Sequence, residues 1–158
     1  MRSWLTGEGK EIKFEEVMEI VGAYVDMGGA VSVGTDSFIN KNGCIFTSAI
    51  CLHGAKEQKG GRYFFKKKVL PKKDFLAFSK RIIFEVQESI ELGAKVLEFF
   101  PDMDIELHMD ISSADKNNKT SKLATMLIGY ASGAGFKYRI KPDAYAAASV
   151  ADKHSKND

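Results

Sequence analysis

Residues 30–53, AVSVGTDSFINKNGCIFTSAICLH, contain two apolar runs separated by a polar segment. The first run leads into Gly34-Thr35-Asp36-Ser37, and the second follows the dipeptide Asn42-Gly43. Apolar runs on either side of Asn-Gly are typical of a β-hairpin. The pattern therefore predicts a strand over residues 30–36 and another over 43–53, with Asp36 at the end of the first.

Hydrophobic periodicity predicts further elements on both sides of this hairpin. We expect residues 1–12 to form an irregular N-terminal arm, because most of them are polar or glycine. The remaining predicted elements are a helix from Phe14 to Gly28-Gly29, a strand over 62–69, a helix over 71–99, a strand over 105–111, a helix over 117–133, a strand over 136–140, and an Ala-rich helix from Pro142-Asp143 to about Lys153.

The order of these elements predicts an α/β fold. Three hairpin-like strands followed by helix-linked strands suggest a mixed sheet with helices on its faces. With right-handed crossovers, the fourth strand can lie beside the first. At 158 residues, we interpret the chain as a single domain spanning residues 1–158.

Composition narrows the functional classes. A hydrophobic share of 44% and a charged share of 28% exclude a mainly disordered chain, and a net charge of +2 does not by itself argue for nucleic acid. We find no signal-peptide pattern and no apolar run near 18 residues, so we expect a cytoplasmic protein without a membrane partner. Cys44 and Cys51 fall on opposite faces of one strand, so we expect no disulfide between them.

Five lysines gather between residues 66 and 73. Such a run is typical of a solvated sheet edge or the start of a helix, and phosphate contact is the alternative. The adjacent Tyr63-Phe64 pair favours sheet packing over base stacking.

Two acids are predicted to meet at the end of the sheet. Asp36 ends the first strand, and Asp110 lies near the end of the fourth. Ligand sites in open α/β sheets collect at strand ends. Two carboxylates at close range repel each other, so such a pair is expected to bind a divalent cation or to have a raised pKa.

Two further acids could join this pair. Glu85 lies at the margin of the apolar stripe of its helix, whereas Glu88 and Glu91 point outward and are expected to be solvated. Asp152 lies on the last helix, whose alanines would allow close packing against the sheet.

These residues carry a family resemblance. The chain resembles the YkuK family of ribonuclease H-like bacterial proteins, whose members are mostly uncharacterised. The resemblance covers residues 14 to 156. One departure is Phe38, because family members commonly have a polar residue at that position. It rests on GTDS (34–37), RIIFE (81–85), HMDIS (108–112), NKTSKL (118–123) and IKPDAYAAASVADKH (140–154).

The resemblance implies a ribonuclease H-like fold with a five-stranded sheet of order 3-2-1-4-5 and an extra N-terminal helix. In the wider superfamily, four acids hold two magnesium or manganese ions, which cut phosphodiester bonds of nucleic acid to leave 3′-hydroxyl and 5′-phosphate ends. Lys119 is a candidate phosphate contact, and His154 is a candidate for proton transfer or product release. The positions that match the four acids are Asp36, Glu85, Asp110 and Asp152.

Other interpretations remain open. Asp36 could cap a turn, Glu85 and Asp152 could be surface acids, and His108 is expected to be a hydrogen-bonded structural residue. The leading hypothesis is a metal-dependent nuclease acting on RNA, DNA or a hybrid. The alternative is a non-catalytic module that binds nucleic acid or protein. An actin-like nucleotide-binding lobe ranks last, because the chain is short and has no Gly-rich phosphate element.

Overall fold

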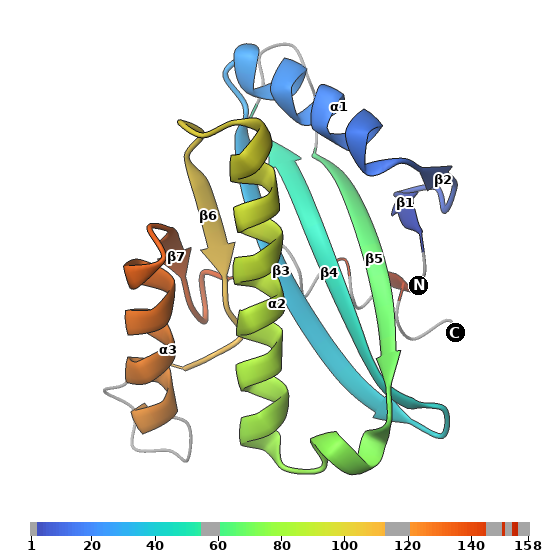
Figure 1. Ribbon diagram of the computed structural model, residues 1–158, viewed down its shortest axis with the longest axis vertical. Helices are drawn as coiled ribbons and strands as arrows, with labels where there is room; N and C mark the ends of the chain where they lie inside the picture. The colour runs from blue at the N-terminus through green and yellow to red at the C-terminus, as the bar shows by residue number, and fades with distance from the viewer. Residues whose placement is uncertain (1–2, 55–60, 113–120, 145–149, 151–152, 155–158) are drawn as a thin grey trace.

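The computed structural model describes residues 3–54, 61–112, 121–144, 150 and 153–154 (Figure 1). Within these residues, seven strands form one mixed sheet with the order β2-β1-β5-β4-β3-β6-β7. The elements in chain order are β1 (Trp4–Thr6), β2 (Glu11–Ile12), α1 (Phe14–Asp26), β3 (Ala30–Asn40), β4 (Gly43–His53), β5 (Arg62–Leu70), the 3-10 helix η1 (Lys72–Phe75), α2 (Phe78–Phe99), β6 (Ile105–His108), α3 (Ser121–Gly133) and β7 (Lys137–Arg139).

The N-terminal segment is not the irregular arm that the sequence predicts. β1 pairs antiparallel with β2 and, on its other side, with β5 through Leu5 and Phe65. The expected five-stranded sheet is therefore wrong, because β1 and β2 extend the sheet to seven strands. The five expected strands follow one another as β5-β4-β3-β6-β7 inside this longer order. Pairing with β1 also means that β5 is not a sheet edge.

The β3–β4 hairpin is longer than predicted. β3 continues past Asp36 to Asn40, and a two-residue turn connects it to Gly43. The backbone N–H of Asn42 donates to Oδ1 of Asn40 at 2.8 Å. Gly43 has a φ of 143°, and a Cβ there would lie 2.5 Å from the carbonyl oxygen of Leu70. Glycine is therefore required where the hairpin meets β5.

Helix α1 ends where the sequence predicts, at Gly28-Gly29. The N–H of Gly29 donates to the carbonyl of Tyr24 at 3.0 Å, and the N–H of Gly28 donates to that of Val25 at 2.9 Å. Gly28 has a φ of 88°, which completes a Schellman motif and turns the chain into β3.

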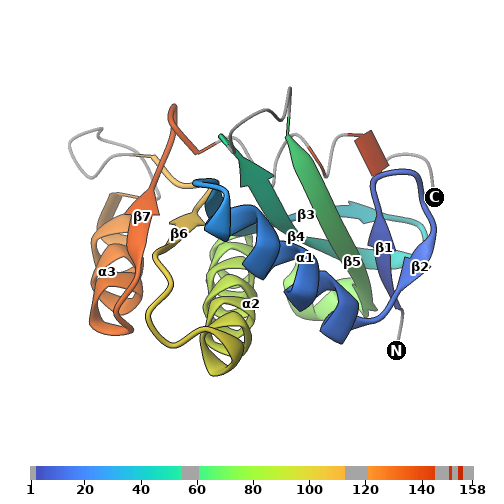
Figure 2. The same cartoon turned by 90° about the horizontal axis from the view of Figure 1, so that it is seen from above.

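Helices α1, α2 and α3 pack on one face of the sheet and share one core (Figure 2). The long predicted helix over 71–99 is divided, because η1 precedes an extended residue, Ala77, before α2 begins at Phe78. Phe78, at the start of α2, is 49% exposed. The buried side chains of α2 include Ile82, Val86, Ile90, Leu92 and Val96.

Helix α3 packs against the core through small and aliphatic residues. Ala124, Leu127 and Ala131 are buried, whereas Met126 and Tyr130 are about half exposed. Small residues on the inner face allow α3 to lie close to its neighbours. Gly93 has the same effect in α2, because a Cβ added there would lie 2.8 Å from the ring of Phe136.

The opposite face of the sheet carries a second, smaller cluster. Ala49 and Phe65 are buried there together with Val150 from the C-terminal segment. Val150, Lys153 and His154 are helical, but most of the predicted last helix lies outside the described residues. None of the described helices is long and apolar enough to cross a membrane.

Candidate metal centre

The parallel pairing of β3 with β6 brings Asp36 and Asp110 together. The register runs from Val31 opposite Ile105 to Gly34 opposite His108, where β6 ends. Asp36 lies two residues beyond this last pair in β3, and Asp110 lies two residues beyond it in the segment that follows β6. The expected adjacency of the first and fourth strands is confirmed, although Asp36 lies within β3 rather than at its end.

Two hydrogen bonds set the position of helix α2 along β3. The hydroxyl of Ser37 donates to Oε2 of Glu85 at 2.5 Å, and the hydroxyl of Ser89 donates to Oγ1 of Thr35 at 3.0 Å. Four helical residues rise about 6 Å, and two strand residues span about 6.6 Å, so both bonds can form at once. This match places Glu85 beside Ser37 at the level of Asp36.

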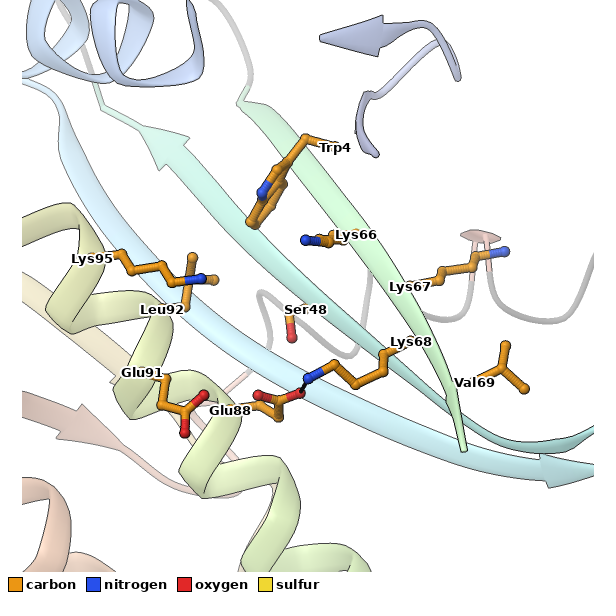
Figure 3. A pocket seen from close by; sticks show the side chains of 10 residues that line it. All are labelled: Trp4, Ser48, Lys66, Lys67, Lys68, Val69, Glu88, Glu91, Leu92 and Lys95. Carbon is orange, nitrogen blue, oxygen red and sulfur yellow. Dashed lines mark ion pairs between the residues drawn. The ribbon is translucent and has the colours of Figure 1, made fainter. Parts of the chain in front are cut away.

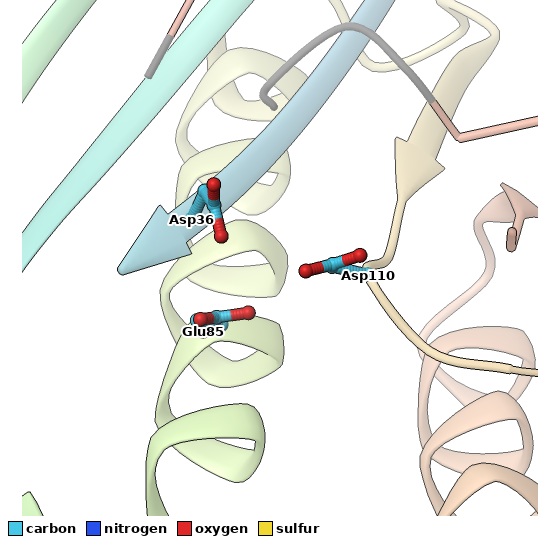
Figure 4. A group of neighbouring side chains, drawn as sticks. All are labelled: Asp36, Glu85 and Asp110. Carbon is cyan, nitrogen blue, oxygen red and sulfur yellow. The ribbon is translucent and has the colours of Figure 1, made fainter. Parts of the chain in front are cut away.

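Asp36, Glu85 and Asp110 form one group of carboxylates (Figure 4). One oxygen from each residue lies within 4.8 Å of those of the other two. The three side chains come from β3, from α2 and from the segment after β6. Hard oxygen ligands at this separation fit magnesium or manganese, because these ions prefer carboxylates to softer donors.

Glu85 is the buried acid of the group. It is only 5% exposed. Burial raises the pKa of its carboxyl well above the usual range; Asp36 and Asp110 raise it further, and Ser37 and Arg81 oppose the shift. A raised pKa is what an acidic cluster shows when no cation balances its charge.

Lys141 contacts the acidic group, although the sequence pattern did not predict this contact. Its Nζ lies 2.9 Å from Oδ1 of Asp110, in an ion pair that is partly exposed to solvent. The N–H of Lys141 donates to the carbonyl of Ile111 at 3.0 Å, so the chain after β7 continues beside the chain after β6. The sequence feature that could have indicated this contact is the position of Lys141, two residues after β7, because β7 neighbours β6 and Asp110 lies two residues after β6.

The remaining predicted site residues are not part of the described group. Asp152 and Lys119 lie outside the described residues. His154 packs on the opposite face of the sheet from the helices, with its ring stacked 4.0 Å from that of Phe65. Its Nε2 lies 2.6 Å from the hydroxyl of Tyr63. Because β5 is two strands from β3, this position is about 10 Å across the sheet from the strand of Asp36.

Several charged side chains near the site differ from expectation. Glu88 is not a solvated acid, because it pairs with Lys68 and its side chain is 12% exposed. Lys67 is not on a solvated edge, because it is 7% exposed and its Nζ donates to the carbonyl of His154 at 2.7 Å. Glu91 is exposed, as predicted.

His108 is a structural residue, as the sequence analysis expects. It is 3% exposed, and its Nε2 lies 2.8 Å from Oε1 of Glu106. Burial lowers the pKa of this imidazole, which favours the neutral ring. Cys44 and Cys51 are both free thiols, in agreement with their predicted placement.

The fold and the acidic group define a class of protein. The chain belongs to the ribonuclease H-like family, since the family model described as "Ribonuclease H-like" matches residues 13–156. It is also 27% identical over 165 residues to "Uncharacterized protein YkuK" of Bacillus subtilis (strain 168), with 92% of each chain covered. No solved structure matches the chain significantly.

Proposed function

We propose that this protein is a metal-dependent nuclease that hydrolyses phosphodiester bonds of RNA, DNA or a hybrid by a two-metal mechanism. The observation that carries the proposal is the convergence of Asp36, Glu85 and Asp110 from three separate elements to within 4.8 Å. Membership in the ribonuclease H-like family supports it. A buried acidic group is unfavourable without a compensating cation, and its assembly therefore favours a cation-dependent role.

The chain's own residues would divide the work. Asp36, Glu85 and Asp110 would hold magnesium or manganese, with Asp152 as the proposed fourth ligand. The ions, when bound, supply positive charge for the phosphodiester oxygens that become negative during hydrolysis. Ser37 holds one oxygen of Glu85 by its hydrogen bond, which orients the carboxylate before any ion arrives. Lys119 remains a proposed phosphate contact, and His154 a proposed proton-transfer residue.

A second candidate function is a binding module without catalysis. The ion pair between Lys141 and Asp110 favours it, because a lysine on one of the three acids reduces the need for a metal. In this case the protein would bind nucleic acid or another protein through the same fold, and the acids would serve structure alone.

Cleavage assays separate the two candidates. The purified chain should cut at least one of single-stranded RNA, single-stranded DNA, duplex or hybrid in magnesium or manganese, and should not cut in EDTA. Asp110→Asn keeps the shape of the side chain but removes its charge, so it should abolish cleavage while the fold remains intact. Activity that is unchanged in Asp110→Asn would assign the cutting to another site. No cleavage of any substrate by the parent would favour the binding module.

A further inference from the structure

A cavity of about 370 Å³ lies between β5 and α2, beside the N-terminal strand β1 (Figure 3). Glu88 and Glu91 of α2 line it, whereas Glu85, one turn earlier on the same helix, belongs to the acidic group. The cavity is therefore a separate site from the candidate metal centre. Its volume is in the range of sites that hold a small organic ligand.

Lysines from two facing elements converge on this cavity. Lys66 and Lys68 alternate along β5 and point to the α2 face, and Lys95 approaches from α2 (Figure 3). Glu88 pairs with Lys68, and Glu91 also lines the cavity, so the three converging lysines outnumber the two acids. The pKa of Lys66 is lowered by burial and by the neighbouring Lys95 and Lys68. This crowding of positive charge is relieved when an anion binds.

The other walls supply an aromatic surface and a hydroxyl. The indole of Trp4 lies at one end of the cavity, where Phe14 supports it with ring centroids 5.8 Å apart (Figure 3). Ser48 forms part of the floor, and its Oγ lies 3.0 Å from Oγ1 of Thr35. Thr35 also accepts a hydrogen bond from Ser89, so the floor is anchored to α2.

We propose that this cavity binds a nucleotide, with its phosphate on Lys66, Lys68 and Lys95 and its base against Trp4. Ammonium groups are strong phosphate ligands, and bases stack on aromatic rings irrespective of their sequence. A ligand with an anion at one end and a flat ring at the other matches the two ends of the cavity. The phosphate belongs either to a free nucleotide or to a nucleotide within a strand. The inference goes beyond the nuclease proposal, because binding here needs no metal.

Trp4 is the single tryptophan of the chain, so its fluorescence reports directly on the cavity. Adenosine 5′-monophosphate, added in EDTA with excitation at the red edge of the indole band, should quench the emission in a saturable way. Adenosine, which lacks the phosphate, should bind at least about tenfold more weakly, as expected for the loss of hydrogen bonds to charged groups. A linear, unsaturable response to adenosine 5′-monophosphate would overturn the proposal.

Variants test the lysines in both directions. Lys66→Gln and the more exposed Lys95→Gln should each weaken binding, by about tenfold for Lys66. Glu88→Gln should strengthen it, because Lys68 loses its intramolecular partner. Lys122→Gln, an exposed lysine on α3, is the matched control and should bind like the parent. Unchanged affinity in both Lys66→Gln and Lys95→Gln would overturn the proposal. If one of the two variants fails to fold, unchanged affinity in the other would overturn it.

Two further arms identify the source of the phosphate and separate this site from the metal centre. An oligoadenylate without terminal phosphates that displaces adenosine 5′-monophosphate would assign the cavity to a strand, and failure to displace it would assign the cavity to a free nucleotide. Asp110→Asn should retain the fluorescence response while losing any cleavage. Loss of the response in Asp110→Asn with the fold intact would overturn the separation of the two sites.

Discussion

Asp36 and Asp110 each lie two residues beyond Gly34 and His108, the last pair in register between β3 and β6. Parallel strands keep equivalent positions side by side. Because Asp36 and Asp110 are each two residues past the last pair, the two acids come together. β6 ends there while β3 continues to Asn40, which leaves one side of β3 open to the carboxylates and to Glu85. The candidate metal centre is thus a consequence of two strands of unequal length.

Replacing Glu85 tests the group directly. Glu85→Gln should weaken manganese binding by more than about tenfold, because even changes to outer-shell partners cost 10–100-fold in metal affinity. The same variant should raise metal-free stability, since it removes the repulsion of Asp36 and Asp110 while Ser37 keeps an oxygen acceptor. The measurement is thermal unfolding with and without manganese. Glu91→Gln, on an exposed position of the same helix, is the control, and an equal manganese shift in both variants would contradict a ligand role for Glu85.

The raised pKa of Glu85 predicts how metal-free stability depends on pH. Between the ordinary glutamate pKa of 4.5 and the raised value, the folded chain holds a proton that the unfolded chain has released. The free energy of unfolding should therefore fall as pH rises through this window. Manganese binds the ionised carboxylate, so its stabilising effect should grow over the same range. Denaturant titrations over a pH series check both trends, and Glu85→Gln should flatten them; a metal-free stability that rises with pH in this window would contradict the prediction.

Lys141 should compete with a metal for Asp110. Lys141→Gln removes the ammonium that lies 2.9 Å from Asp110 Oδ1, so manganese affinity should rise. We expect a gain of a few-fold, because a partly exposed ion pair contributes at most about 1 kcal/mol. Lys137→Gln is the matched control, since Lys137 pairs with Asp104 in a highly exposed contact. Manganese titration of the two variants should separate them, and a weaker affinity in Lys141→Gln would show that the lysine supports the site instead.

Two glycines test the packing that holds α2 against the sheet. Gly93→Ala should destabilise the protein by about 1–3 kcal/mol, because its Cβ would lie 2.8 Å from the ring of Phe136. Gly129→Ala on α3 meets nothing within 4 Å and should stabilise by up to about 1 kcal/mol through helix propensity. In a chain of this size, each kcal/mol shifts the melting temperature by roughly 2–4 °C. Melting curves in which both variants move in the same direction would contradict the close approach at Gly93.

The sequence by itself determined the elements whose signals are local. The Asn-Gly dipeptide indicated the β3–β4 hairpin, the paired glycines ended α1, and the apolar period within residues 71–99 indicated a long helix, most of which is α2. These signals depend on backbone geometry and side-chain periodicity, which are properties of neighbouring residues. The order of strands and helices then favoured adjacency of the first and fourth strands and hence of Asp36 and Asp110. Helix position added Glu85 and Asp152 as further candidates, and the resemblance matched these four positions to the acids of the superfamily.

The tertiary structure alone decided what depends on contacts between distant residues. Local polarity made residues 1–12 resemble an arm, but pairing with β5 makes Trp4–Thr6 part of the sheet, and Glu11–Ile12 pairs with that strand in turn. The lysine run was compatible with a solvated edge, yet β1 pairs with β5, the C-terminal segment at His154 contacts the buried Lys67, and Lys66 and Lys68 face α2 across a cavity with Trp4. Helical position already distinguished Glu85 from Glu88, but the hydrogen bond of Glu85 to Ser37 and the ion pair of Glu88 with Lys68 appear only in the tertiary structure. These contacts join elements that are distant in sequence, and they depend on packing against neighbouring elements, which no local pattern encodes.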